Sequence, residues 1–178
     1  MMFEGDGHIY QNCFVVPDID YAMAQWMKGI GAGPFFILRH VDNLPIEYRG
    51  APSTMDISVA LGQAGPIHIE LIQVHCDNPT VYTDMYPKGT GGFHHVGMIA
   101  KDIEAAIHAY EKSGSSLVLR GVVASTPFAY VDSRRSLGFF TEFHQDTPQI
   151  RGLYQGVADA ALEWKGENPI RSMADLLP

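Results

Sequence analysis

Two stretches of the sequence, QNCFVVPDID at residues 11–20 and HVGMIAKDIE at residues 95–104, share one layout and decide the fold. Each begins with a side chain that can bind a metal, Gln11 or His95, and seven residues later reaches an aspartate that can cap a helix. The apolar run between these two positions is typical of a strand. The repeated layout therefore predicts two copies of one strand–helix unit.

A second pair of matching positions lies late in each copy. Glu70 stands in HIELIQ and Glu142 in FTEFHQ, both in the pattern Glu-apolar-x-Gln. An unpaired carboxylate in such an apolar strand would cost several kcal/mol, and a bound metal ion would remove that cost. The alternative is an ion pair with an arginine such as Arg134 or Arg135. Two copies that each supply two ligand-type side chains predict one metal site between them.

The patterns around these motifs predict an α+β fold of tandem βαβββ modules, which form a cupped, β-barrel-like sheet. The first module covers residues 1–77 and the second covers residues 93–147, with a linker rich in Pro, Gly, Thr and Asp at residues 78–92. Apolar residues at helical spacing predict a C-terminal helical tail over residues 148–178, which packs on the barrel, covers a pocket or meets a partner subunit. Ligands at matching positions of the modules should converge on one cavity.

Each module is expected to contain four strands and one helix. In the first module we expect strands at residues 9–16, 35–41, 55–61 and 67–74 and a helix at residues 21–27. In the second module we expect strands at residues 94–100, 117–123, 128–132 and 137–144 and a helix at residues 103–112. A further helix is expected at residues 153–164 of the tail.

Composition excludes several classes of protein. The chain has 178 residues and a formal net charge of -8, and its 12 Lys and Arg residues are scattered, which argues against nucleic-acid binding. Cys13 and Cys76 match no zinc-ribbon, redox or disulfide spacing and are expected to be buried free thiols. No apolar run reaches the roughly 18 residues of a membrane span, and the N-terminus lacks the pattern of a signal peptide. We therefore expect a cytoplasmic protein with no membrane partner.

The motifs VVPDIDYAMAQW, GPFF, IELIQ and GGFHHVGMIAKDI, in this order, resemble the vicinal oxygen chelate superfamily, especially its branch with methylmalonyl-CoA epimerase and glyoxalase I. The resemblance covers roughly residues 9–145. It implies that Gln11, Glu70, His95 and Glu142 bind one divalent metal ion, Zn, Co, Ni, Mn or Mg. This ligand set is similar to that of glyoxalase I, whereas FHHVGMIAKDIEA is similar to the epimerase, so the ligands alone do not choose the reaction.

Two other histidines compete with these positions. His8 is an alternative to Gln11 because imidazole is the better donor for most divalent metals. Gln11, however, lies seven residues before Asp18, as His95 lies seven residues before Asp102. Strand alternation places His8 and Gln11 on opposite faces. The same alternation predicts that His94 points away from His95, as a structural residue or one that supports the ligands.

The resemblance implies an isomerase, epimerase or glyoxalase-type lyase that removes a proton next to a metal-bound carbonyl or thioester and forms an enolate. Glu142 is expected to act as ligand and base together. Asp56 is a second candidate base, unless it is a solvent-facing strand residue. The available aromatic side chains favour an apolar ketone or thioester as the small-molecule substrate.

Two alternatives stay open. A metal-free protein that sequesters an apolar ligand, like the bleomycin-resistance proteins, has the same fold. A ferrous extradiol dioxygenase is less favoured, since Gln11 and Glu70 depart from the two-histidine, one-carboxylate pattern of that chemistry. Homodimers are common in the superfamily, so we also expect a homodimer.

Overall fold

The predicted order of strands and helices recurs in residues 8–176, the part of the chain that the computed structural model describes. The elements are β1 (Ile9–Val15), α1 (Ile19–Ile30), β2 (Phe35–Val41), β3 (Ile46–Tyr48), β4 (Ala51–Ser53), β5 (Ile57–Ala64), β6 (Ile67–Val74), β7 (Gly92–Ala100), α2 (Ile103–Lys112), β8 (Ser116–Val123), β9 (Thr126–Asp132), α3 (Arg134–Leu137), β10 (Phe140–Gln145), α4 (Pro148–Leu162), β11 (Ile170–Ser172) and η1 (Met173–Leu176). The ends of the predicted first module and tail, residues 1–7 and 177–178, lie outside the described residues.

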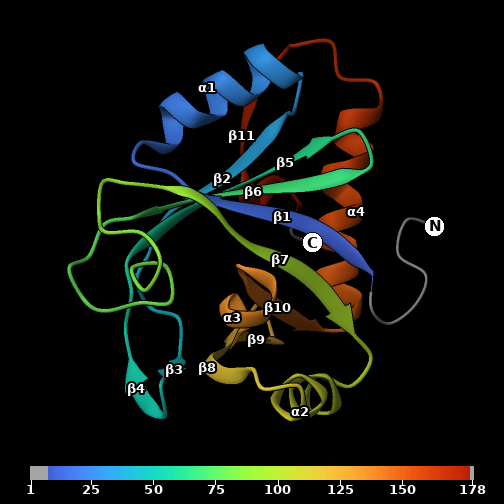
Figure 1. Ribbon diagram of the computed structural model, residues 1–178. Helices are drawn as coiled ribbons and strands as arrows, with labels where there is room; N and C mark the ends of the chain where they lie inside the picture. The colour runs from blue at the N-terminus through green and yellow to red at the C-terminus, as the bar shows by residue number, and fades with distance from the viewer. Residues whose placement is uncertain (1–7, 177–178) are drawn as a thin grey trace.

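The strands of residues 8–176 form one curved, unclosed sheet in the order β11-β2-β5-β6-β1-β7-β10-β9-β8-β3-β4 (Figure 1). The two strands that open the repeated motifs, β1 and β7, pair antiparallel at its centre. On either side of this pair, β6 runs parallel to β1 and β10 runs parallel to β7. The α+β fold with a repeated βαβββ order is therefore confirmed, while the division at residues 78–92 stays a prediction.

The repeated polar residues hold each helix at its first turn. Asp18 caps α1 and Asp102 caps α2, and each carboxylate accepts a hydrogen bond from the backbone N–H three residues further on, at 2.9 and 3.0 Å. The glutamines of the Glu-apolar-x-Gln motifs reach the same helix ends from β6 and β10. Gln73 Oε1 accepts the first N–H of α1 at 3.0 Å, and Gln145 Oε1 accepts that of α2 at 3.1 Å. The sequence repeat thus encodes one way of joining a helix to two parallel strands.

The helices cover the outer faces and one side of the cup. Helix α1 packs against β5 and β6, and α2 packs against β8, β9 and β10 in the other half (Figure 1). Helix α4, from the predicted tail, contacts β5 and buries Ile150, Tyr154 and Val157. Of the three roles expected for the tail, packing on the sheet is observed, and Ile150, Leu153 and Tyr154 of α4 line one wall of a pocket.

Several elements differ from the prediction. Residues 46–53, expected as a loop, form the β3–β4 hairpin, which leaves the first half and pairs with β8 of the second (Figure 1). Strand β11, also unexpected, pairs with β2. The strand predicted at residues 137–144 is wrong at its start, because α3 ends at Leu137 and Gly138 turns the chain with a φ of 87° before β10. Helix α4 begins at Pro148, with Thr147 as its cap.

Candidate functional site

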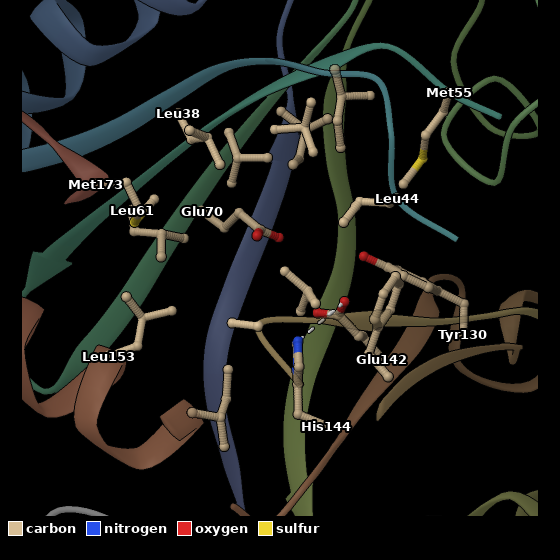
Figure 2. Close-up of a pocket in the computed structure, with 18 of the residues that line it drawn as sticks. Leu38, Leu44, Met55, Leu61, Glu70, Tyr130, Glu142, His144, Leu153 and Met173 are labelled. Atoms are coloured by element: carbon tan, nitrogen blue, oxygen red, sulfur yellow. Dashed lines mark ion pairs between the residues drawn. The ribbon is translucent and has the colours of Figure 1, made fainter. Parts of the chain in front are cut away.

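A cavity of about 300 Å³ lies inside the cup. Its lining is mostly hydrocarbon and includes Leu38, Val59, Leu61, Phe128, Leu153 and Met173. Glu70, Glu142, His144 and Tyr130 supply polar atoms, and Figure 2 shows the two carboxylates pointing toward each other from opposite strands. No Lys or Arg occurs among the described residues that line the cavity. The site is therefore apolar, with its negative charge concentrated at one place.

Three of the four predicted ligands meet at His95. Its Nε2 lies 3.2 Å from Glu142 Oε2 and 3.2 Å from Glu70 Oε2. His95 is fully buried, and the side chains of Glu142 and Glu70 are only 5% and 12% exposed. The positions come from the repeated register, because Cys13 of β1 is opposite both Glu70 and His95, while Glu142 lies diagonally two residues along β10. The central strand pair thus brings one carboxylate from each half to a single imidazole.

The charges of this cluster depend on one another. Burial disfavours the charged form of His95, but Glu142 and Glu70 outweigh this and raise the pKa of His95 well above its usual value. Burial likewise acts to raise the pKa of Glu142, but His144 and His95 outweigh it, and the pKa of Glu142 falls below its usual value. Without a cation at the site, the positive charge of protonated His95 therefore offsets only part of the negative charge of this cluster.

His94 fixes the orientation of the His95 ring. Its Nε2 lies 3.1 Å from the Val81 carbonyl and must donate to it, so its Nδ1 accepts the proton of His95 Nδ1 at 2.9 Å. Burial lowers the pKa of His94 to about 3, which keeps this ring neutral. The His95 Nε2 atom is therefore the one presented to the carboxylates, as expected for a supported metal ligand.

The prediction that His94 points away from His95 is wrong. The pairing of β1 with β7 shifts between Cys13, opposite His95, and Phe14, opposite Phe93, so His94 is the extra residue of a β-bulge. The bulge breaks the alternation of the strand and turns both rings to the same buried region, where each has 0% exposure.

Gln11, the fourth predicted ligand, is 1% exposed and faces His68 across the strand pair. Its Nε2 lies 3.2 Å from His68 Nδ1. Within the described residues, Gln11 Oε1 and His68 Nε2 are buried without a hydrogen-bond partner, and Glu70 Oε2 has none beyond its ion-pair contact with His95 Nε2. Gln11 Oε1 and Glu70 Oε2 are acceptors that a divalent cation would satisfy, whereas His68 Nε2 carries the ring proton, because Nδ1 accepts from the Gln11 amide. The donor set thus fits a metal site, which Gln11, Glu70, His95 and Glu142 would form.

Three residues that face this site were missed by sequence reasoning. Cys13 is fully buried, and it forms a possible metal-binding group with Glu70 and His95, their ligand atoms within 4.8 Å of one another. His68 and His144 lie one strand period, two residues, from Glu70 and Glu142. The period-two alternation that places the glutamates in the cup also places their i±2 neighbours there, so this signal was available.

His144 extends the polar cluster toward α4. Its Nε2 lies 3.8 Å from Glu142 Oε1, the contact drawn in Figure 2, and its Nδ1 lies 3.0 Å from Tyr10 Oη. Tyr10 Oη donates to Tyr154 Oη at 2.9 Å. A buried chain of polar groups therefore leads from the Glu142 carboxylate to the helix that forms one wall of the cavity.

The remaining predicted residues lie elsewhere. His8 is exposed, whereas Gln11 is buried at the cluster. Asp56 turns away from the cavity, although its neighbours Met55 and Ile57 line it, and its carboxylate lies 3.0 Å from His40 Nδ1. This placement does not suit a base in the cavity, because alternation puts consecutive side chains on opposite faces.

The arginine alternative for the buried glutamates does not hold. Arg134 binds the Asp132 carboxylate at 2.6 Å and donates to the Asp84 carbonyl at 2.8 Å. Arg135 is exposed on α3. The two buried carboxylates therefore face histidines.

The fold agrees with a comparison to known families. Residues 10–130 match the model of the Glyoxalase/Bleomycin resistance protein/Dioxygenase superfamily. The match spans more than half of the chain, and the chain belongs to this superfamily, which confirms the resemblance to the vicinal oxygen chelate proteins. No curated protein matches the chain.

Solved structures with the same fold include a hypothetical protein and two structures of methylmalonyl-CoA epimerase. A hypothetical protein from Bacillus halodurans C-125 is 17% identical with a TM-score of 0.55, and the match covers 80% of this chain and 96% of that one. The methylmalonyl-CoA epimerase from Mycobacterium tuberculosis is 14% identical with a TM-score of 0.55, covering 85% and 96%. A methylmalonyl-CoA epimerase in complex with methylmalonyl-CoA and NH4+ is 14% identical with a TM-score of 0.56, covering 81% and 97%. At these identities the likeness shows the fold alone.

Among residues 8–176, no helix is both long enough and apolar enough to span a membrane.

Proposed function

We propose that the protein is a divalent-metal-dependent isomerase, epimerase or lyase that removes a proton next to the carbonyl of an apolar ketone or thioester. The observation that supports this most is the convergence of buried, partly unsatisfied ligand atoms beside an apolar cavity. A divalent cation held by Gln11, Glu70, His95 and Glu142 would polarise the substrate carbonyl and stabilise the enolate formed when the proton leaves.

Glu142 is the residue best placed to accept the proton. Its carboxylate lines the cavity, and the neighbouring histidines lower its pKa, so it is ionised at neutral pH. One oxygen faces His95, and the other lies 3.8 Å from His144 Nε2. Because a general base must reach the proton that it removes, a substrate carbon beside Glu142 satisfies the geometric requirement. His144, which lies beside Glu142, is a candidate to carry the abstracted proton before the proton returns to the substrate carbon.

The lining indicates the substrate class. A cavity of about 300 Å³ lies at the small end of the usual range for ligand sites, roughly 300–1,000 Å³. Because no described lining residue is Lys or Arg, the cavity offers no cationic side chain to a carboxylate or phosphate. We therefore favour a neutral, apolar ketone or the acyl end of a thioester. A CoA thioester belongs in the test panel, since the epimerase neighbour was solved with methylmalonyl-CoA.

A second candidate is a metal-free protein that binds an apolar ligand, and the hydrocarbon lining favours it. Metal content separates the two. Protein purified without chelator should contain one divalent ion per chain, and Glu142→Gln and Glu70→Gln should lose it, whereas Glu111→Gln, an exposed residue of α2, should keep it. The proposal of a metal-dependent enzyme would be refuted if the wild-type protein contained no stoichiometric metal and bound added divalent ions only weakly.

The reaction itself is tested by exchange with heavy water. The wild type should incorporate solvent deuterium next to the carbonyl of at least one member of a panel of ketones and α-branched thioesters, including methylmalonyl-CoA. Glu142→Gln should abolish this exchange, and Glu111→Gln should leave it unchanged. No exchange with any member would count against proton abstraction.

The homodimer and the cytoplasmic location stay predictions.

A further inference from the structure

A second cluster of ligand-type side chains lies outside the cavity, on the opposite face of β5. His40 Nδ1 is 3.0 and 3.2 Å from the two carboxylate oxygens of Asp56. The rings of His40 and His75 lie close together, with centroids 4.3 Å apart. His75 Nε2 is 2.8 Å from Ser58 Oγ. One ligand atom from each of His40, Asp56 and His75 lies within 4.8 Å of the others.

The backbone is arranged to bring these residues together. The pairing of β2 with β5 is irregular between Leu38 and Val41, and His40 within this bulge has a φ of 51°. A bulge re-aims a side chain, and here it turns His40 toward Asp56 while its N–H donates to Ser58 Oγ at 3.3 Å. His75 follows β6 directly, and its N–H donates to the Asp56 carbonyl at 2.9 Å. Three strand ends thus present one side chain each.

The chemistry of this cluster is that of a transition-metal site. Two imidazoles and one carboxylate are the protein ligands of many zinc centres, with water in the fourth position. The Ser58 hydroxyl binds one ring nitrogen of His75, as supporting groups do around metal-binding histidines. Two cationic side chains that act electrostatically on His75 are paired with other carboxylates, and the first of them, Arg39, binds Asp20 at 2.6 Å. Lys88 is paired in the same way, with Asp77 at 2.7 Å.

We propose that His40, Asp56 and His75 bind a second divalent transition-metal ion, of which Zn²⁺ fits the ligands best, independently of the ion in the cavity. The location gives this ion a mechanical role. The chain leaves β2 just after His40, forms the β3–β4 hairpin on the other half of the sheet, and returns at Asp56 before β5. Leu44 and Met55 of this segment line the cavity. A metal at His40 and Asp56 ties both ends of the segment that forms this wall.

Zinc titration of the whole protein, freed of metal, tests the proposal. Calorimetry should show two equivalents of Zn²⁺ for the wild type, one for His75→Ala, and one for Glu142→Gln, in which the cavity site is disabled. His40→Ala provides a second variant, because this side chain is 63% exposed and its loss should not affect folding. His108→Ala, an exposed histidine of α2, is the matched control and should keep two equivalents.

The outcomes separate this proposal from the proposed function. If the wild type binds one equivalent that is lost in His75→Ala and kept in Glu142→Gln, the second site stands and the cavity metal fails. If His75→Ala and His40→Ala bind Zn²⁺ with the stoichiometry and affinity of the wild type, the second site is refuted. Zinc should also raise the melting temperature of Glu142→Gln, and this rise should disappear when His75→Ala is added.

Discussion

Binding of Zn²⁺ to the cavity site should release about one proton per metal ion at pH 7. Without metal, burial lowers the pKa of His95, but Glu142 and Glu70 outweigh it and raise the pKa to about 9, so the ring is protonated. A metal ligand must be neutral, and the proton on Nε2 has to leave. Removing a proton at pH 7 from a group with a pKa of about 9 costs on the order of 3 kcal/mol. The apparent affinity should therefore rise about tenfold per pH unit between pH 6 and 8.

Calorimetry in buffers of different ionisation enthalpy measures this release. In a His75→Ala background, which removes the second proposed site, the slope of observed enthalpy against buffer enthalpy should show about one proton. His95→Gln should lower the affinity and bring the slope to about zero, while His108→Gln should change neither. A slope near zero in the His75→Ala background, or an unchanged slope in His95→Gln, would refute the reasoning. Burial and the Glu70 carboxylate raise the pKa of the Cys13 thiol, so this thiol is protonated in the absence of metal. A slope near two would therefore indicate that Cys13 also binds the metal and releases its proton.

Further predictions concern packing and capping. A Cβ at Gly97 would lie 2.5 Å from Gln11 Oε1, so Gly97→Ala should weaken metal binding and lower the unfolding free energy by about 1–3 kcal/mol in urea titrations. The same change at Gly29 in α1, where nothing lies within 4 Å, should instead raise it by about 0.5–1 kcal/mol; a loss there would contradict the packing argument. Asp18→Ala and Asp102→Ala should each cost about 1 kcal/mol by the same measurement, and the double variant should show the sum, unless the two helix ends are coupled.

The two strand–helix units could be predicted from the sequence because each repeated polar residue contacts a helix end in both copies. Asp18 and Asp102 cap helices within three residues, and Gln73 and Gln145 reach the same helix ends at the same interval after the glutamates. Period-two alternation then places Glu70 and its counterpart inside the cup. These rules need only the order of residues along each strand.

The remaining features depend on partners far along the chain. The β3–β4 segment contains Pro52 and Gly50 and reads as a loop, and only pairing with β8 makes it a hairpin. His94 joins the site because β7 has a bulge opposite β1, and no local pattern reveals which residue is the extra one. For Asp56 the sequence leaves two interpretations open, a base in the cavity or a solvent-facing strand residue, and only the bulge at His40, which gives Asp56 a partner outside the cavity, favours the second.

The ends of the sheet bear on self-association. The outermost strands, β4 and β11, have three residues each, and β4 contains Pro52, which has no N–H to donate. Short strands and prolines at such positions deny an incoming chain the long row of free backbone groups that aggregation and strand exchange require. Two copies of this protein therefore have little means of joining their sheets into one. A homodimer, if it forms, should be held together by side chains of the helices or loops, and it should dissociate without unfolding the sheet.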